Sequence, residues 1–402
     1  MTATNGSAVP TRRRGRVLGC IMTLALALSA LVFAPAAANA ETTTYLSLGD
    51  SISFGYTAEK FKENFPNEAP AYFEEGFTNL FQKKLAGKEE VGKGITLVND
   101  ACPGETSNGL IGENEAIFGQ KSTEPATANP QGPGDWHPCA YHNVNGLPLK
   151  NSLEVGKESI SQLEDALSIL KEGAPAHPVK VITLNIGSND ELAGVAECKK
   201  EIETEFGEKF YALQPNTVGA PNYHEFWGPL NGDPAHDGPI EFQAFKACLI
   251  GKSLYYQTPY LVSQIAHIIE VLDGTSTGAG HFTGQLIVMG FYNPDAFTLP
   301  GSDGLQANLN SEILTKLKVL AGAGFANLHF ANPFLVVNKG NPTTEQSNIC
   351  KYTEMCNPNV QASPPSSPVA PVGKDGDIHP TKAGAAALAK LANEAYLAPP
   401  IS

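Results

Sequence analysis

The sequence has 402 residues and a formal net charge of −14 at pH 7, with 41 acidic and 27 basic residues. This surplus of acidic side chains repels phosphates, so we exclude nucleic acid as a partner. The length suits one large domain with insertions, or two domains.

Residues 1–40 have the pattern of a secretory signal peptide. Arginines at 12–14 and 16 precede an almost wholly apolar stretch at 17–34, and Ala38-Asn39-Ala40 is a small-x-small cleavage site. Cleavage near Ala40 would release an extracellular chain of residues 41–402. Loss of the four arginines leaves 23 basic residues and a net charge near −18. No later stretch is apolar enough to cross a bilayer, so we expect no stable membrane anchor.

Five short apolar runs after the signal peptide predict buried strands. Several are rich in β-branched residues and free of charges, as strands covered on both faces should be. The predicted strands are residues 43–48, 94–98, 179–186, 285–291 and 326–331.

Apolar residues at helical spacing lie between these strands. The predicted helices are residues 71–86, 158–171, 241–272, 304–320 and 381–396. Because strands and helices alternate, we predict an α/β fold with a mostly parallel, five-stranded sheet.

Three stretches interrupt this alternation, near residues 111–150, 197–240 and 332–378. Long loops in a compact domain are usually functional or disordered. The first two stretches contain aromatic residues, so they either form substrate-binding walls or are surface excursions held in place by disulfides.

Six cysteines follow the predicted cleavage site, at Cys102, Cys139, Cys198, Cys248, Cys350 and Cys356. An even number in an exported protein indicates three disulfides. Sequential pairing is our hypothesis, because each neighbouring pair brackets an insertion. The sequence contains no C-x-x-C pair, so the cysteines do not favour a zinc or redox site.

Two serines are candidate nucleophiles. Ser51 directly follows the first predicted strand, in Gly49-Asp50-Ser51, and parallel strands present their carboxyl ends to a ligand crevice. Ser276 lies in a G-x-S-x-G pattern at residues 274–278, but a helix precedes it and a strand follows it, the reverse of the context that this motif needs. We therefore favour Ser51, whose plain alternative role is a helix cap.

Loops after two other strands and a late histidine supply partners for Ser51. Gly104 follows the second strand, Asn189 follows the third, and His379 precedes the last helix. Acyl transfer through serine needs a hydroxyl, a base and donors aimed at the developing oxyanion. We predict His379 as the base and an oxyanion hole formed by the Ser51 N–H, the Gly104 N–H and the Asn189 amide. Singly, each residue also fits a turn, a cap or a loop, but their shared placement favours catalysis.

The blocks Gly49-Asp50-Ser51, the loop around Gly104, Gly187-Ser188-Asn189-Asp190 and Asp377-Ile378-His379-Pro380, in that order, resemble the SGNH (GDSL-type) hydrolase superfamily. The resemblance spans residues from about 43 to 397 with the insertions set aside. The run at residues 286–294 further resembles the fourth strand of exported bacterial lipases and esterases of that group. The resemblance implies a flavodoxin-like three-layer α/β/α sandwich. It also implies a serine esterase mechanism without a metal or another cofactor.

The acid that orients the histidine is less well defined, because Gly376 stands where the family's D-x-x-H block has its aspartate. Asp377 is our preferred acid and Asp375 is an alternative. A main-chain carbonyl, in a Ser-His dyad, is a third arrangement.

The other histidines show no metal-ligand spacing. His267 and His329 lie in a predicted helix and a predicted strand, so we expect them to be structural. His137, His142, His224 and His236 lie in the insertions.

These observations predict a secreted, monomeric carboxylic ester hydrolase that acts on a small-molecule or lipid ester. An alternative is a carbohydrate esterase that removes acetyl groups from polysaccharides, because aromatic loops stack on sugars as readily as on acyl chains. An alternative of another class is an exported binding protein with a degenerate hydrolase site. The intact Ser51, Asn189 and His379 argue against it.

Overall fold

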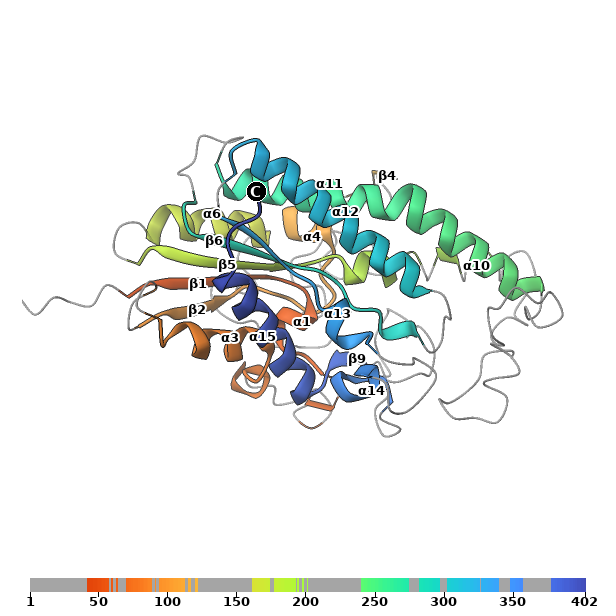
Figure 1. Cartoon of the computed structure of the whole chain (residues 1–402), viewed down its shortest axis with the longest axis horizontal. Helices are drawn as coiled ribbons and strands as arrows, with labels where there is room; N and C mark the ends of the chain where they lie inside the picture. Colours follow the sequence, from red (N-terminus) through yellow and green to blue (C-terminus); the bar gives the residue numbers. More distant parts are fainter. Residues whose placement is uncertain are drawn as a thin grey trace, which may run out of the picture. The chain divides into compact units, whose positions relative to one another are not determined.

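The five predicted strands form one parallel sheet in the computed structural model of the chain. They are β1 (Thr44–Gly49), β2 (Thr96–Asn99), β5 (Val179–Asn185), β6 (Gln285–Met289) and β7 (Leu328–Ala331). They pair in the order β2-β1-β5-β6-β7, and every pairing is parallel (Figure 1). When these five strands are numbered one to five in chain order, their order in the sheet is 2-1-3-4-5, which is the order of flavodoxin-like folds. The predicted fold class is therefore confirmed.

The structure describes part of the unit Thr42–Ser402. The described residues are 42–57, 59–60, 63, 70–88, 91, 94–112, 115–116, 120–121, 161–173, 177–192, 194, 197–198, 201, 240–274, 282–296, 302–325, 327–339, 348–356 and 377–402. The predicted signal peptide, most of the three insertions, Cys139, Ser276 and Asp375 lie outside these residues.

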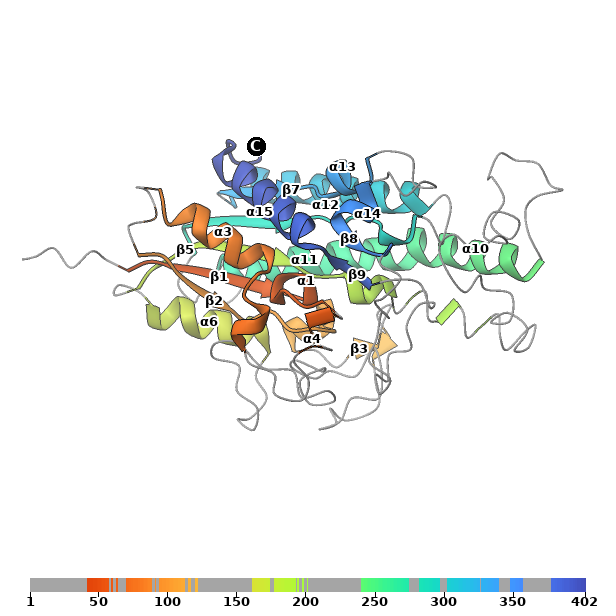
Figure 2. The same ribbon diagram turned by 90° about the horizontal axis from the view of Figure 1, so that it is seen from below.

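Helices cover both faces of the sheet (Figures 1 and 2). On one face lie α3 (Phe77–Leu85) and α15 (Lys382–Leu397), and on the other α6 (Gln162–Gly173), α11 (Thr258–Leu272) and α12 (Ser302–Gly322). Successive strand residues point to opposite faces, so Tyr45 joins the first core and Leu46 the second. All six residues of β1 are buried, as a strand covered on both sides requires.

The helices follow the predicted periodicity with two refinements. The pattern at 241–272 is one run of α10 (Ile240–Lys252), a π-helical segment η4 (Ser253–Gln257) and α11. The pattern at 71–86 begins as a 3-10 turn, η1 (Pro70–Phe73), before α3. Single turns of π-helix inside α-helices occur often at functional sites.

Short elements that the sequence did not predict lie around the carboxyl edge of the sheet. They are α1 (Ser51–Phe54), α4 (Ser107–Ile111), η5 (Pro294–Ala296), α13 (Phe334–Val337) and α14 (Asn348–Tyr352), with the strand pairs β3 (Glu115–Ala116) with β4 (Gln120–Lys121) and β8 (Thr353–Glu354) with β9 (Asp377–Pro380). The block that contains His379 is therefore a strand, β9, antiparallel to β8, and not a loop.

Two of the predicted disulfides join described cysteines, Cys198 to Cys248 and Cys350 to Cys356. Cys102 is also disulfide-bonded, but Cys139 lies outside the described residues, so this third pairing stays a prediction. Among the helices that the structure describes, none has the length and apolarity to span a membrane.

Candidate active site

The turn after β1 fixes the position of Ser51. Gly49 has a φ of 143°, and a Cβ atom there would lie 2.1 Å from the Asn185 carbonyl oxygen of the neighbouring strand, so the turn needs glycine. Asp50 is the N-cap of α1, because its side chain accepts a hydrogen bond from the Ile52 N–H at 2.9 Å. The cap role that the sequence left open for Ser51 therefore belongs to Asp50. Ser51 is the first residue of α1 and is 8% exposed.

His379 lies directly against this serine. Its Nε2 atom is 2.7 Å from Ser51 Oγ, across 328 residues of sequence. Its Nδ1 atom is hydrogen-bonded to Asp377 Oδ1, and its backbone N–H donates to the same oxygen at 3.1 Å. Asp377 is fully buried. Serine, imidazole and carboxylate thus form one continuous hydrogen-bonded line.

Contacts from three elements hold the histidine in this line. The Tyr56 ring meets the His379 ring edge-on, with centroids 4.7 Å apart. The Tyr292 hydroxyl, at the end of β6, donates to the Ile378 carbonyl at 2.8 Å. The Thr381 N–H donates to the Tyr352 carbonyl at 3.0 Å, within the segment that the Cys350–Cys356 disulfide closes.

The two loops predicted to form the oxyanion hole are joined to each other. Gly104 has a φ of 80°, which only glycine adopts readily, and Asn189 Nδ2 donates to the Glu105 carbonyl at 2.8 Å. This bond uses one of the two amide hydrogens of Asn189. Within the described residues, neither the Ser51 N–H nor the Gly104 N–H donates a hydrogen bond.

A buried carboxylate adds a second link between these loops. Asp190 accepts from the Ser107 hydroxyl at 2.6 Å and from the Ser107 N–H at 2.9 Å. Burial raises the pKa of Asp190 to about 6, and both hydrogen bonds from Ser107 oppose that rise. The Asn189-Asp190 pair therefore fixes the loop after β5 to the start of α4.

Sequence reasoning missed Gln162, the first residue of α6. Its Oε1 atom accepts from the Gly49 N–H at 2.9 Å, and its Nε2 atom donates to the Gly49 carbonyl at 2.9 Å and to Glu105 Oε2 at 3.1 Å. One side chain thus connects the nucleophile turn to the glycine loop. A faint signal exists in the sequence, since Gln162 shares a helix face with Ala166 and Ile169 and so points inward.

Asp50 is a second carboxyl group near His379. Its burial raises its pKa to about 7, while the Ile52 N–H and the nearby His379 act in the opposite direction. Its contact to the Ile52 N–H makes it a helix cap, and Asp377 occupies the position beside His379 Nδ1.

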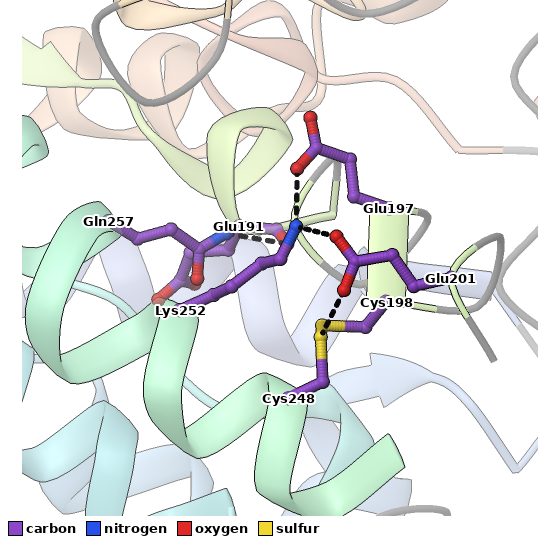
Figure 3. Close-up of a disulfide and its surroundings, with 7 residues drawn as sticks. All are labelled: Glu191, Glu197, Cys198, Glu201, Cys248, Lys252 and Gln257. Atoms are coloured by element: carbon purple, nitrogen blue, oxygen red, sulfur yellow. Dashed lines mark hydrogen bonds and ion pairs between the residues drawn. A yellow bond between two sulfur atoms is a disulfide. The ribbon is translucent and has the colours of Figure 1, made fainter. Parts of the chain in front are cut away.

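The π-helical segment supports the loop after β5 from the other side. Gln257 Nε2 lies 3.2 Å from the Asp190 carbonyl. The same atom lies 3.4 Å from the Glu191 carbonyl (Figure 3). Next to it, Lys252 pairs with Glu197 at 2.8 Å and with Glu201 at 2.7 Å, beside the Cys198–Cys248 disulfide. Part of the second insertion is therefore fastened to the helix that supports Asn189.

The histidines away from Ser51 take different positions. His267 is exposed on α11, and His329 is buried in β7, where burial lowers its pKa. His137, His142, His224 and His236 lie outside the described residues. Within the described part of the chain, no group of His, Cys, Asp and Glu residues is placed to hold a metal ion.

Two cavities are lined by residues next in sequence to Ser51 and His379. One has a volume of about 60 Å³ and lies toward β5, β6 and α12. The other has a volume of about 190 Å³ and lies toward η1, β9 and the start of α15. Ile52 and Phe77 form a wall of both cavities.

Comparison with known proteins finds similarity at the level of solved structures. No protein-family model matches the chain, and no curated protein matches it. An extracellular lipase from Streptomyces rimosus is 14% identical, with 88% of this chain and 100% of the lipase covered and a TM-score of 0.37. A protein called TesA is 13% identical, with 88% and 98% covered and a TM-score of 0.34. At these values, neither similarity establishes a family or an activity for this chain.

Proposed function

We propose that the chain is an exported serine ester hydrolase of the SGNH (GDSL) type, with Ser51 as nucleophile, His379 as base and Asp377 as the orienting acid. One observation carries the proposal: Ser51 Oγ lies 2.7 Å from His379 Nε2 while Asp377 is hydrogen-bonded to the opposite ring nitrogen. This is the arrangement of nucleophile, base and orienting group that activates a serine.

In the proposed reaction, His379 Nε2 takes the hydroxyl proton as Ser51 Oγ attacks the ester carbonyl. Asp377 keeps the Nδ1 proton directed toward its carboxylate and stabilises the imidazolium that forms. His379 then gives its proton to the departing alcohol. A water molecule, deprotonated by the same nitrogen, releases the acyl group from Ser51.

The charge on the carbonyl oxygen needs donors that are already in place. We assign this role to the Ser51 N–H, the Gly104 N–H and the second amide hydrogen of Asn189. The bonds of Gln162 to Gly49 and of Asn189 to Glu105 hold these groups before substrate arrives. Donors fixed in advance do not have to reorganise during the reaction, which makes this kind of stabilisation effective.

Export is part of the proposal. The disulfides Cys198–Cys248 and Cys350–Cys356 are of a kind that persists in oxidising compartments, and the sequence of residues 1–40 has signal-peptide character.

The direct test is Ser51→Ala in the chain that begins at residue 41, assayed on a panel of p-nitrophenyl esters and with a fluorophosphonate probe. We expect a loss of about 10⁴-fold or more in kcat, together with loss of labelling, because the nucleophile is removed. Ser53→Ala is the matched control, since Ser53 lies two residues further along α1, with its hydroxyl buried and without a partner among the described residues. Full hydrolysis by Ser51→Ala would contradict the mechanism, and an unlabelled, inactive wild type would favour the binding protein.

A further inference from the structure

The smaller cavity lies directly beside the proposed catalytic groups. Ile52, Ser188 and Ile378 line it, and they are the chain neighbours of Ser51, Asn189 and His379. Consecutive Cα atoms are about 3.8 Å apart, so these three residues place the cavity next to the backbone that carries the proposed catalytic groups. A group attached to the ester carbonyl has only a short distance to enter it.

The two cavities differ in which side of the reaction they serve. The smaller one includes Asn185, Ser188 and Glu191, from the end of β5 and the loop that carries Asn189. The larger one includes Pro380 and Thr381, which follow His379. In ester hydrolysis the acyl group stays with the oxyanion donors while the alcohol leaves toward the base. The smaller cavity therefore suits the acyl group and the larger one the alcohol.

The volume of the smaller cavity limits the acyl chain. It is about 60 Å³, compared with about 190 Å³ for the larger cavity. Its walls are largely apolar, with Phe77, Met289 and Leu388 among them. This space favours a short acyl chain over a long one.

Two polar atoms make this cavity unsuited to a plain hydrocarbon chain. Asn185 Oδ1 and Gln306 Nε2 are buried and have no hydrogen-bond partner among the described residues, and both side chains line the cavity. Asn185 is 4% exposed and Gln306 is 7% exposed. One atom is an acceptor and the other is a donor, and a ligand hydroxyl can satisfy either kind.

Other amides close to this cavity are fully paired. Asn310, one turn along α12 from Gln306, accepts from the Phe291 N–H at 2.8 Å and donates to the Phe291 carbonyl at 2.8 Å. Asn338 makes the same double contact with Asn293, at 2.9 and 2.8 Å. Buried polar groups are nearly always paired with protein, water or ligand, and of the described residues with an unpaired buried atom, Asn185 and Gln306 are the two that line this cavity. A ligand that enters the cavity can therefore pair them.

Resting on the proposed hydrolase function, we propose that this cavity is the acyl subsite and that it selects short acyl groups carrying a hydroxyl, as in esters of short hydroxy acids. Gln306, assisted by Asn185, is the specificity-determining residue. A site built to bind a hydroxyl discriminates strongly against the analogue that lacks it, since the buried polar groups then stay unpaired.

The test compares ethyl 3-hydroxybutyrate, ethyl butyrate and ethyl octanoate by pH-stat titration, with the wild type and Gln306→Leu. For the wild type we expect kcat/KM on the hydroxybutyrate ester to exceed that on the butyrate ester by about tenfold or more, and octanoate to be the poorest substrate. In Gln306→Leu this preference should disappear while butyrate is still hydrolysed.

Gln285→Leu is the matched control. Gln285 also has an unpaired buried amide oxygen, but it lies at the start of β6, whereas the cavity is lined by Met289 at the end of that strand. This variant should keep the wild-type preference. Product inhibition of the wild type supplies a measurement that needs no variant, and free 3-hydroxybutyrate should inhibit more strongly than butyrate.

The outcomes separate the two proposals. Ester hydrolysis without a preference for the hydroxyl, or a preference that Gln306→Leu retains, would overturn the acyl subsite and leave the hydrolase function standing. If no ester is hydrolysed and a fluorophosphonate does not label Ser51, the hydrolase function fails, and the subsite fails with it.

Discussion

The nucleophile and the base of the proposed site are held in place in different ways. Ser51 follows a central strand of the sheet, and Asp50 and Gln162 fix its turn from inside the core. His379 lies on β9, outside the main sheet, where a two-stranded ribbon and the ring of Tyr56 hold it. The nucleophile thus depends on the core of the fold, and the base depends on a peripheral addition to it.

This difference predicts that substitutions near Ser51 and near His379 affect stability and activity in different proportions. Packing around β1 cannot loosen without loss of the sheet, so changes near Ser51 should affect stability and activity together. The β8–β9 ribbon makes few of the sheet contacts, so changes there should reduce activity more than stability. Three predictions test this contrast, in order of decreasing effect.

The largest effect is expected on the base side, for Asp377→Asn. An amide cannot hold the imidazole in the required tautomer, so kcat should fall by about 10⁴-fold while KM and the melting temperature change little. Steady-state kinetics measure kcat and KM, and calorimetry measures the melting temperature. Asp375→Asn is the control and should keep most of its activity. A loss of less than about tenfold in Asp377→Asn would instead favour a Ser-His dyad.

On the nucleophile side, Gln162→Leu removes the hydrogen bonds to Gly49 and Glu105. We expect kcat to fall about 10²-fold, because misplaced catalytic groups cost that much, with a smaller change in KM. Chemical denaturation should also show a loss of about 1–3 kcal/mol, since the buried Gly49 N–H is left unpaired while the Gly49 carbonyl keeps its bond from the Cys102 N–H.

Gln82→Leu is the matched control for Gln162→Leu. Gln82 lies on α3, away from the site, and its side chain donates one hydrogen bond to the Ile95 carbonyl. This variant should lower stability slightly and leave kcat unchanged. To separate positioning from simple structural loss, Gln162→Leu is combined with Asn189→Ala. The effects on kcat should be less than additive if both act through the same donors. Additive effects would mean that Gln162 only stabilises the fold.

The smallest effect on rate is expected from removal of the disulfides in turn. Cys198 and Cys248 are 50 residues apart, and Cys350 and Cys356 are 6 apart, so chain entropy gives about 4 and about 2 kcal/mol. Replacing the 350–356 pair by serine should lower kcat several-fold, because it closes the segment that supports β9. Replacing the 198–248 pair should lower the melting temperature more and kcat less. The opposite ranking would show that the two sides are not independent.

The sheet could be predicted from sequence because its strands are buried on both faces and their apolar runs are local signals. Ser51, Gly104 and Asn189 were predicted for a related reason, since each lies in the segment that follows such a strand. Gly49 explains why the turn works, but its close approach to the Asn185 carbonyl involves a residue far away in sequence. That contact could not be derived from the local pattern.

Other features depend on contacts that no local pattern encodes. Gln162 has the same appearance as any polar residue at a helix start, and its role exists only where Gly49 and Glu105 come within reach. The strand β9 is too short to predict, because it forms by pairing with β8. The π-helical turn that directs Gln257 has no propensity signal, since helical spacing continues through it.

The separation of Ser51 and His379 by 328 residues has a further consequence for biosynthesis. A ribosome adds about 5–20 residues per second, so the serine is made many seconds before its base. During that interval the chain can form much of the sheet but cannot activate the hydroxyl. If Ser51 and His379 act as proposed, a chain synthesised only as far as the sheet has no base for its serine.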